Sequence, residues 1–278
     1  MLKMGVLGKP ISHSLSPVLH RRAYEILKID AQFTAHEIDE TNYFEFYQTA
    51  RDSGWRGLAL TMPLKEIALG FADRIDPLAK QIRSINTIIF ESTGSIGLST
   101  DMLAFKNLLK PYFGKKIAIL GAGGTARAAI GALNGTNTQV TVLTRSTIRH
   151  DQLHNAAHNL DLDFMSWSGF EEVQDRDLII STTPAGATDG LNLLTTSADF
   201  FEVTYHPWPT ELAKRYQNLG RLVIGGLTLL VEQALYQIQY FAAAQLPQNK
   251  LTTEQFDDLR IELTEAVRTA RRATCQPP

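Results

Sequence analysis

The sequence predicts an α/β protein built from two domains. Short apolar runs typical of buried strands alternate with segments whose apolar residues recur at helical spacing, as far as about residue 225. The chain has 278 residues, of which 44% are hydrophobic, and this is enough material for two ordinary hydrophobic cores. A glycine-rich turn at residues 121–126 directly follows an apolar run, which is typical of a nucleotide-binding α/β domain.

The first stretch, to residue 101, alternates strands and helices. Apolar runs predict strands at residues 4–7, 31–38 and 57–61. Helical spacing of apolar residues predicts helices at residues 17–27 and 41–50. Two further runs, at residues 85–90 and 96–99, flank a turn at residues 92–94, and together they predict a β-hairpin.

The remaining chain divides into a second α/β stretch and a helical end. In the second stretch, apolar runs predict strands at residues 116–120, 140–143, 178–181, 202–205 and 222–224. A helix is expected at residues 126–133, between the first two of these strands. The third stretch predicts two long helices, at residues 229–244 and 253–273.

The glycine-rich turn carries the strongest functional signal. Gly121 permits a tight turn after the strand, Gly123 lets the backbone approach a pyrophosphate, and Ala126 lets the following helix pack closely. The helix that begins near Thr125 directs its free N–H groups and positive dipole end towards the phosphates. The strand–turn–helix order predicts a Rossmann-type dinucleotide site, although small residues also occur in ordinary turns.

The end of the second strand of this unit indicates which dinucleotide is bound. Enzymes that use NAD usually carry Asp or Glu there, to accept a hydrogen bond from the ribose 2′-hydroxyl. Residues 143–149 read Leu-Thr-Arg-Ser-Thr-Ile-Arg and contain no acid. Guanidinium groups bind phosphate in a fixed fork geometry, so Arg145 and Arg149 suit the 2′-phosphate of NADP. The alternative is that they are solvated loop arginines, which is more plausible for Arg149.

A lysine and an aspartate upstream of the turn suggest proton-transfer chemistry. Lys65 follows a strand end, and Asp101 follows the hairpin, so both could line a cleft beyond the carboxyl ends of strands. A partly desolvated lysine can exchange protons, and a nearby carboxylate can orient it. The alternatives are a surface lysine and a helix N-cap aspartate.

Two serines before the first helix could hold an anion. Ser14 and Ser16 could offer hydroxyls to a carboxylate near a helix start, where anions are favoured. The competing interpretation, which the residues alone favour, is simple capping, with Ser16 as N-cap and Pro17 at the first helical position. His13 and His20 have no partner at metal-ligand spacing, so no metal site is expected.

Composition and charge exclude several classes of protein. The net charge is −2 and the chain has no long basic run, which argues against nucleic-acid binding. The single cysteine, Cys275, permits neither a disulfide within the chain nor a cysteine-based metal site. Residues 1–7 lack the pattern of a signal peptide, and the apolar stretches are too short to span a bilayer. We therefore expect a soluble cytoplasmic protein with no membrane partner.

Motifs along nearly the whole chain resemble those of the shikimate dehydrogenase family. They occur in the family's order, at residues 8–17 (GKPISHSLSP), 57–65 (GLALTMPLK), 85–87 (INT), 99–101 (STD), 121–126 (GAGGTA), 144–146 (TRS), 181–186 (STTPAG), 205–210 (YHPWPT) and 225–233 (GGLTLLVEQ). No single motif is decisive, but so many in order are strongly specific.

The resemblance implies NADP-dependent, reversible reduction of 3-dehydroshikimate to shikimate. This reaction belongs to the shikimate pathway, which leads to chorismate and the aromatic amino acids. In the resembling enzymes, the positions of Ser14 and Ser16 hold the substrate carboxylate. The lysine matching Lys65 transfers the proton and is paired with the aspartate matching Asp101. Positions implied to contact the ring hydroxyls or to lie nearby are Thr61, Asn86, Gln233 and Tyr205.

The resemblance further implies the cofactor contacts and the domain layout. The C-terminal helices would return to the first domain, so residues 1–101 plus 227–278 would form a substrate domain and residues 102–226 the dinucleotide-binding domain. The expected assembly is a monomer or a homodimer. Positions implied to contact NADP are Gly121, Ala122, Gly123, Gly124, Thr125, Ala126, Thr144, Arg145, Arg149, Thr182, Pro184 and Gly226.

Six positions depart from the family pattern and leave alternatives open. These are Ala59, Ser99, Ala104, Thr144, Glu202 and Leu229. Such changes could loosen the substrate fit or shift preference towards quinate. A methylene-tetrahydrofolate dehydrogenase has a similar layout, but the serine motif suits a small carboxylic acid better. A regulatory protein that has lost turnover is a further alternative, although Lys65 and Asp101 are both present.

Overall fold

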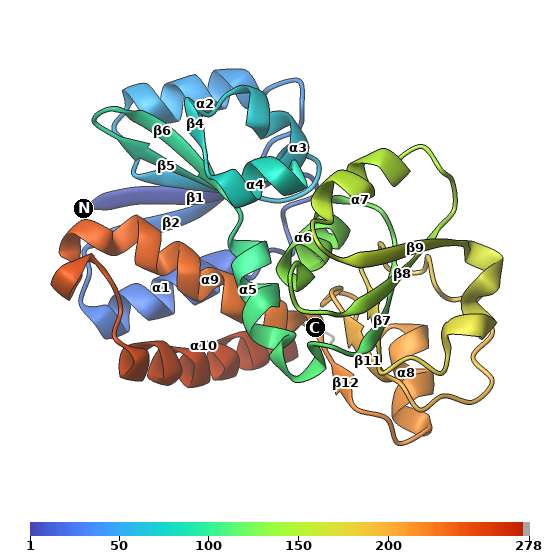
Figure 1. The fold of residues 1–278 in the computed structure, drawn as a ribbon. Helices are drawn as coiled ribbons and strands as arrows, with labels where there is room; N and C mark the ends of the chain where they lie inside the picture. The colour runs from blue at the N-terminus through green and yellow to red at the C-terminus, as the bar shows by residue number, and fades with distance from the viewer. Residues whose placement is uncertain (275–278) are drawn as a thin grey trace. The chain divides into compact units, whose positions relative to one another are not determined.

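The protein is an α/β protein of two compact units, as expected from the sequence (Figure 1). The computed structural model describes residues 1–274, so Cys275 lies outside the described residues. Unit 1 comprises Met1–Lys80, Ser84–Thr100 and Leu230–Pro278, and unit 2 comprises Gln81–Arg83 and Asp101–Leu229. Within residues 1–274, no helix has both the length and the apolar character that a membrane crossing needs.

Unit 1 is built on a mixed six-stranded sheet with the strand order β2-β1-β3-β5-β6-β4. The strands are β1 (Leu2–Gly8), β2 (Ala31–Glu37), β3 (Gly57–Leu60), β4 (Arg74–Ile75), β5 (Thr87–Glu91) and β6 (Gly94–Leu98). β1 runs parallel to β2 and to β3, whereas β5 is antiparallel to β3 and to β6. The antiparallel β5–β6 pair confirms the predicted hairpin.

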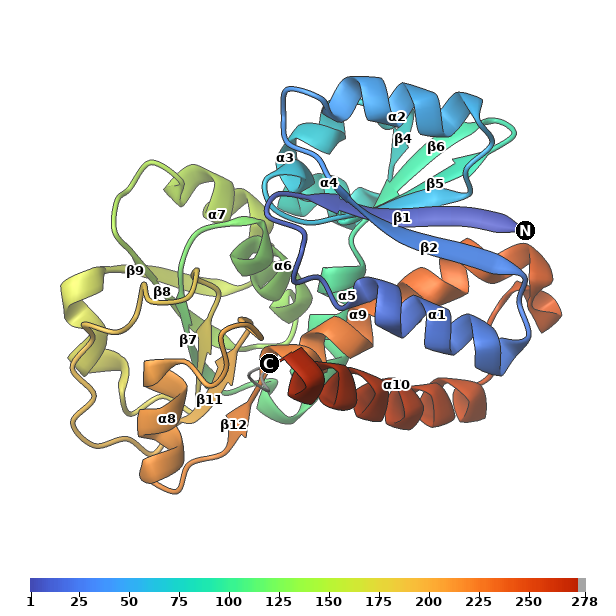
Figure 2. The same ribbon diagram turned by 180° about the vertical axis from the view of Figure 1, so that it is seen from behind.

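Helices cover both faces of this sheet (Figure 2). On one face, Tyr43 and Tyr47 of α2 pack with Leu64 of α3 against Leu58 and Ile88 of the sheet. On the other face lie α1, α9 and α10, and α10 packs against α1. This contact confirms that the C-terminal helices return to the first domain. The helices are α1 (Ser16–Leu27), α2 (Tyr43–Asp52), α3 (Leu64–Ile67), α4 (Pro77–Ile82), α9 (Gly226–Ala242) and α10 (Thr253–Thr274), with the short 3₁₀ helices η1 (Ala68–Gly70), η4 (Ala243–Gln245) and η5 (Pro247–Asn249).

Unit 2 contains a six-stranded sheet, entirely parallel, with the order β12-β11-β10-β7-β8-β9. The chain builds outward from β7 in one direction and then returns to build outward in the other, which is the strand order of a Rossmann domain. The strands are β7 (Lys116–Leu120), β8 (Gln139–Thr144), β9 (Asp161–Ser166), β10 (Leu178–Ser181), β11 (Asp199–Glu202) and β12 (Val223–Ile224). The helices are α5 (Thr100–Leu108), η2 (Lys110–Tyr112), α6 (Gly124–Leu133), α7 (His150–Ala156), η3 (Trp167–Val173) and α8 (Glu211–Asn218).

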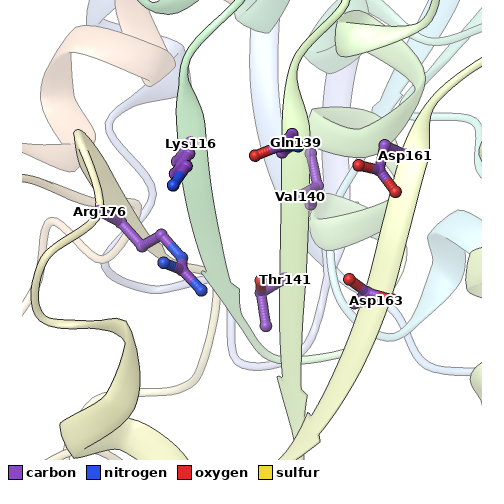
Figure 3. A pocket seen from close by; sticks show the side chains of 7 residues that line it. All are labelled: Lys116, Gln139, Val140, Thr141, Asp161, Asp163 and Arg176. Atoms are coloured by element: carbon purple, nitrogen blue, oxygen red, sulfur yellow. The ribbon is translucent and has the colours of Figure 1, made fainter.

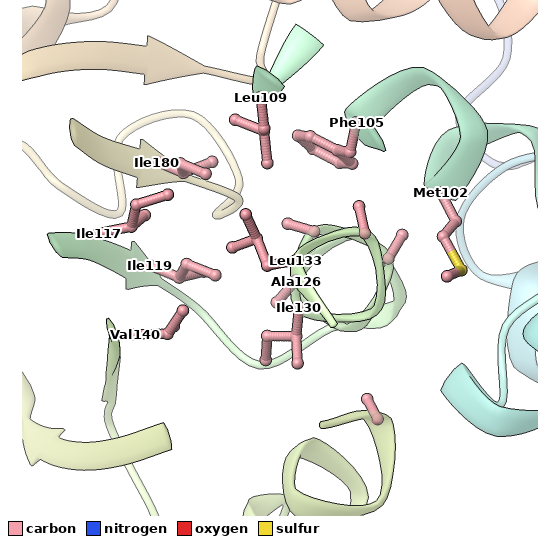
Figure 4. Packing of buried hydrophobic residues seen from close by; sticks show 14 of the residues in the cluster. Met102, Phe105, Leu109, Ile117, Ile119, Ala126, Ile130, Leu133, Val140 and Ile180 are labelled. Carbon is pink, nitrogen blue, oxygen red and sulfur yellow. The ribbon is translucent and has the colours of Figure 1, made fainter. Parts of the chain in front are cut away.

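The core of unit 2 places α6 directly against the sheet (Figure 4). Ile130 and Leu133 of α6 are fully buried in one cluster with Ile119 of β7 and Ile180 of β10. Four alanines of α6 also belong to this cluster, and their small side chains let the neighbouring elements approach the helix closely. They are Ala126, Ala128, Ala129 and Ala132. The core thereby fixes the glycine-rich turn, which joins β7 to α6.

Two strand predictions in unit 2 require correction. The strand expected at residues 202–205 lies at Asp199–Glu202. Phe200 and Phe201 are fully buried in two separate apolar clusters of unit 2, and they pair with β10 and β12. The edge strand β9 was not predicted from its sequence, Asp-Leu-Asp-Phe-Met-Ser. Its residues are exposed or only half-buried, so the apolar signal that identifies a strand is weak.

The core of unit 1 contains a histidine that should make folding sensitive to acid. His20 is fully buried and stacked on Phe33, with ring centroids 3.8 Å apart, and burial lowers its pKa to about 3. An unfolded histidine takes up a proton below about pH 6.5, whereas folded His20 stays neutral until about pH 3. The free energy of unfolding should therefore fall as the pH falls through this window, by about 2 kcal/mol between pH 7 and pH 5.

Urea unfolding at pH 7 and pH 5 measures this loss. The variant His20→Gln lacks the titrating ring, so its own loss of stability between the two pH values should be smaller than that of the wild type by about the same 2 kcal/mol. Equal losses in the two proteins would contradict the assignment of the acid sensitivity to His20.

Candidate functional site

Three of the predicted site residues, one catalytic and two substrate-binding, are tied together at one end of the sheet of unit 1. The Thr61 N–H, directly after β3, donates to the carbonyl of Leu7 on β1 over 2.9 Å. The Leu60 N–H donates to the carbonyl of Asn86 over 2.7 Å, and the Ile85 N–H donates to the carbonyl of Lys65 over 2.9 Å. Thr61, Lys65 and Asn86 therefore share a rigid backbone framework at the carboxyl ends of β1 and β3, where ligands of α/β sheets collect.

The side chain of Asn86 joins a buried cluster of polar groups. Its Oδ1 accepts from the Thr100 N–H over 2.7 Å, and its Nδ2 donates to Thr100 Oγ1 over 2.9 Å. Nδ2 also lies 3.3 Å from Oε1 of Gln233, which comes from α9. Asn86, Thr100 and Gln233 are all less than 9% exposed. The cluster thus brings together two residues predicted for the ring hydroxyls, and Thr100 connects them.

The serine segment precedes α1 as expected, but its capping differs from the sequence-based interpretation. α1 begins at Ser16, and its N-cap position is Leu15, whose side chain makes no capping hydrogen bond. Ser16 is therefore not the N-cap, and the capping alternative is wrong at that position. Ser14 Oγ accepts weakly from the Ser16 N–H over 3.4 Å, and the Ser14 side chain is half-buried.

The proposed proton-transfer pair is distributed over the two units. Lys65 lies in α3 of unit 1 and is half-buried. Asp101 lies in the first turn of α5 in unit 2 and is only 7% exposed. Because α5 already begins at Thr100, Asp101 is inside the helix rather than at its N-cap. Burial of a carboxylate is costly unless other groups compensate its charge, so Asp101 is not an ordinary solvated surface residue.

The glycine-rich turn of unit 2 lies at the switch point of the sheet, between β10 and β8. Gly121 has φ +112°, a conformation that L side chains rarely adopt, and an added Cβ would come within 2.6 Å of Thr182 Oγ1. Thr182 in turn donates from Oγ1 to the Leu120 carbonyl over 2.8 Å. The turn and the end of β10 therefore support each other.

The predicted 2′-phosphate residues follow β8, beside this turn. Thr144 is the last residue of β8, and its Oγ1 lies 2.8 Å from Nε2 of His150. Arg149 Nη1 is 3.5 Å from the Ala122 carbonyl, which links it to the glycine-rich turn. The guanidinium of Arg145 lies 5.6 Å from the ring centroid of Trp167, a cation–π distance. Trp167 is thus a partner of Arg145 that the sequence did not indicate.

The segment after β11 is anchored by a buried carboxylate. Glu202 Oε1 accepts from the Thr204 N–H over 3.1 Å, and Oε2 accepts from Thr210 Oγ1 over 3.2 Å. Burial raises the pKa of Glu202. These bonds hold both ends of the loop that carries the half-buried Tyr205. Gly226 begins α9 next to this segment, and an added Cβ there would overlap the Val203 carbonyl.

A dinucleotide fits the turn of unit 2. Within the described residues, and leaving aside Gly123 and its two chain neighbours, no atom lies within 4 Å of the place that a Cβ on Gly123 would occupy, so the backbone there is open to a ligand. The N-cap position of α6, a ten-residue helix, is Gly123, which has no side chain to cap the helix. Both features suit a pyrophosphate. Pro184, which follows β10, is exposed.

A small polar hollow in unit 2 lies away from this turn (Figure 3). It has a volume of about 120 Å³ and surrounds the first residues of β7, β8 and β9. Its lining includes Lys116, Arg176, Asp161 and Asp163. The glycine-rich turn follows the last residue of β7, so the hollow is at the opposite end of the strand and is not part of the candidate site. Within residues 1–274, no group of three or more His, Cys, Asp or Glu side chains could hold a metal ion.

Comparisons with known proteins find members of one enzyme family. The model of the shikimate dehydrogenase substrate binding domain matches residues 6–88. A shikimate dehydrogenase (NADP(+)) of Methanosarcina acetivorans is 32% identical over 261 residues, which cover 87% of this chain and 93% of the relative.

Two solved structures have the same fold. The shikimate dehydrogenase of Aquifex aeolicus superposes with a TM-score of 0.82 at 25% identity, covering 96% of this chain and 98% of that one. The enzyme of Thermus thermophilus, solved in complex with shikimate, has a TM-score of 0.78 at 26% identity, covering 97% of this chain and 99% of that one. The chain belongs to the shikimate dehydrogenase family.

Proposed function

We propose that this chain is an NADP-dependent shikimate dehydrogenase that interconverts shikimate and 3-dehydroshikimate. The observation that carries the proposal is the arrangement at one end of the sheet of unit 1, where Thr61, Lys65, Asn86 and Gln233 occur together on a bonded framework. These are the residue types and positions that the family resemblance assigns to substrate binding. We further propose that unit 1 is the substrate domain and unit 2 the dinucleotide-binding domain.

The substrate would be held through its carboxylate and its ring hydroxyls. Ser14 and Ser16 supply hydroxyl groups for the carboxylate at the start of α1, where the helix dipole favours an anion. Asn86 and Gln233 supply amide groups, and Thr61 and Tyr205 supply hydroxyls, for the ring. An amide both donates and accepts, so it can bind a hydroxyl while remaining satisfied in a buried site.

The proton would be handled by Lys65. Oxidation of the ring alcohol removes a hydride from carbon and a proton from oxygen, and NADP⁺ supplies the hydride acceptor when bound. Lys65 takes up the hydroxyl proton as the ketone forms and returns it in the reverse direction. Asp101 orients the lysine and compensates its charge. The half-buried position of Lys65 lets it contact a substrate while remaining in exchange with solvent.

The cofactor would be held by unit 2. The turn at residues 121–126 contacts the pyrophosphate, and Thr144, Arg145 and Arg149 contact the 2′-phosphate. Arg149 is already bonded to the turn, and Trp167 restrains the position of Arg145. The further contacts that we assign to the cofactor are those of Thr182, Pro184 and Gly226.

Two neighbouring glycines should respond differently to alanine. Gly121→Ala introduces a strained φ and a contact with Thr182, so it should lower the free energy of unfolding by about 1–3 kcal/mol. Gly123→Ala meets no neighbouring atom, so its stability should match the wild type. The methyl group added at position 123 would occupy the space proposed for the pyrophosphate at the glycine-rich turn. The affinity for NADP⁺ should therefore fall by on the order of tenfold, the equivalent of a lost hydrogen bond or two.

Thermal unfolding and calorimetric titration with NADP⁺ separate the two effects. Gly190→Ala is the control, because it also meets no atom within 4 Å and lies outside the turn. If Gly123→Ala bound NADP⁺ with wild-type affinity, the assignment of the pyrophosphate to the glycine-rich turn would be contradicted.

The activity itself is tested by incubating the purified protein with shikimate and NADP⁺ and following the absorbance of the reduced nicotinamide. We expect rapid reduction, with 3-dehydroshikimate as the product by chromatography. Quinate and NAD⁺ are tested in parallel, because the departures at Ala59 and Ser99 lie close in sequence to Thr61 and Asp101. Confirmed NADP⁺ binding without turnover of either ring acid would reject the proposal.

A further inference from the structure

A second layer of buried polar residues lies behind Asn86 in unit 1. Gln237, one helical turn after Gln233 on α9, donates from Nε2 to Thr87 Oγ1 over 3.0 Å and to the Asn86 carbonyl over 3.3 Å. Its Oε1 lies 3.2 Å from Nε2 of His20 on α1. Gln237 is 2% exposed, and Thr87 and His20 are fully buried. No sequence motif assigned a role to Gln237, and Thr87 was noted only as the last residue of the motif at residues 85–87.

The donors and acceptors of this layer can be assigned without ambiguity. The Asn86 carbonyl can only accept, so the amide nitrogen of Gln237 must face it, and Oε1 must face His20. His20 therefore carries its proton on Nε2, and Nδ1 accepts from the Tyr24 hydroxyl over 3.0 Å. Burial lowers the pKa of His20, which keeps the ring neutral and preserves this arrangement near neutral pH.

The donors and acceptors around the side-chain amides of Asn86 and Gln233 can be assigned in the same way. Thr87 Oγ1 accepts from Gln237, so its own hydrogen is available to Asn86 Oδ1, 3.2 Å away. Asn86 Oδ1 then faces Thr87 and the Thr100 N–H, while Nδ2 faces Thr100 Oγ1 and Gln233. A flip of the Asn86 amide would set a donor against a donor at the Thr100 N–H. The Thr100 N–H and the Thr87 hydroxyl, whose hydrogen is directed by the bond from Gln237, thus favour the same orientation of Asn86.

Loss of one group in this series of hydrogen bonds should change how firmly the Asn86 amide is oriented. A buried donor or acceptor that loses its partner costs more than the bond itself was worth, so the neighbouring groups rearrange to find new partners. Without Gln237, the Thr87 hydroxyl is no longer constrained to donate towards Asn86, and it can turn to Thr100 Oγ1, 3.3 Å away. The orientation of Asn86 would then be less firmly held.

We propose that Gln237 is a positioning residue for substrate binding, which acts through Thr87 to fix the amide of Asn86. The inference rests on the proposed function, since it concerns the residues assigned there to the ring hydroxyls. Gln237 makes no contact with the substrate in this account. Its effect is confined to unit 1 and should leave binding of NADP⁺ by unit 2 unchanged.

The primary test replaces Gln237 with methionine, which has a similar shape but lacks the amide donors and acceptor. We expect the KM for shikimate to rise by about tenfold, the equivalent of a buried hydrogen bond, while the KM for NADP⁺ stays within twofold. Gln239→Met is the matched control on the same helix, because the Gln239 side chain instead accepts from the Leu251 N–H over 3.3 Å. Its two KM values should match those of the wild type.

A second pair of variants tests the route and does not depend on the folding of Gln237→Met. Thr87→Val keeps the shape of the side chain and removes the hydroxyl, so it should also raise the KM for shikimate by about tenfold. Thr87→Ser restores the hydroxyl and should return the KM to within about twofold of the wild type. Circular dichroism and thermal unfolding establish that each variant is folded.

The outcomes separate this inference from the proposed function. A wild-type protein that turns over shikimate, with an unchanged KM for shikimate in folded Gln237→Met or in folded Thr87→Val, overturns the inference and leaves the proposed function standing. Equal rises in the KM values of shikimate and NADP⁺ would indicate a general structural role and also overturn it. A wild-type protein without shikimate turnover overturns both.

Discussion

Replacing Lys65 with methionine is expected to lower kcat for shikimate oxidation by about 10²- to 10⁴-fold, the usual contribution of a positioned acid–base group. The KM for NADP⁺ should not change, because the cofactor residues belong to unit 2. The fold should also be retained, since the backbone carbonyl of Lys65 still accepts from the Ile85 N–H. Steady-state kinetics with both substrates varied measures these effects.

Lys3→Met is the matched control for this experiment. Lys3 is exposed and lies near the start of β1, whereas Lys65 lies beyond the carboxyl ends of β1 and β3. Its kcat should equal that of the wild type. The account of proton transfer would be rejected if kcat of Lys65→Met stayed within about threefold of the wild type, a change too small for a lost general acid–base group.

The partner role of Asp101 is tested by the corresponding double variant. Asp101→Asn alone should lower kcat, because the lysine loses its orienting charge. Residues that act as one unit are not additive, so Lys65→Met combined with Asp101→Asn should be little worse than Lys65→Met alone. If the fold-loss of kcat in the double variant equalled the product of the two single-variant losses, the two residues would act independently.

Replacing Arg145 with alanine is expected to raise the KM for NADP⁺ by about 10- to 100-fold, the range expected for a lost charge-assisted hydrogen bond to phosphate. The KM for NAD⁺ should hardly change, because NAD⁺ has no 2′-phosphate. The ratio of kcat/KM for the two cofactors therefore measures the contribution of Arg145 to specificity.

Arg176→Ala is the control for the loss of a positive charge. Arg176 lies in unit 2, pairs with Asp175 over 3.0 Å and lines the hollow at the opposite end of β7 from the turn. This variant should leave the ratio of kcat/KM for NADP⁺ to kcat/KM for NAD⁺ unchanged. If kcat/KM fell by the same factor for NADP⁺ and NAD⁺ in Arg145→Ala, the arginine would not bind the 2′-phosphate.

The sequence predicted the features of this protein that depend on local chemistry. The turn at Gly121 follows from an apolar strand and from a backbone conformation that glycine adopts readily, and both are visible in the chain. The hairpin of β5 and β6 and the two long C-terminal helices were likewise predicted from the spacing of apolar residues. The α/β class and the strand–turn–helix unit could therefore be read directly.

Other features depend on tertiary contacts and were missed. The position of β11 is set by burial of Phe200 and Phe201 and by pairing with β10, whereas residues 202–205 had the better strand composition. The bonds of Gln237 join residues more than 100 positions apart. One signal was available, because Gln233 and Gln237 are four residues apart and so share a helix face.

The central claim is the transfer of a hydride from shikimate to NADP⁺, and isotopic labelling tests it most directly. Shikimate carrying deuterium on the ring carbon of the reacting hydroxyl is incubated with the wild-type protein and NADP⁺, and the reduced cofactor is analysed by mass spectrometry. The account predicts one deuterium in each NADPH formed. Unlabelled NADPH, with deuterium released to solvent, or no NADPH at all would contradict it.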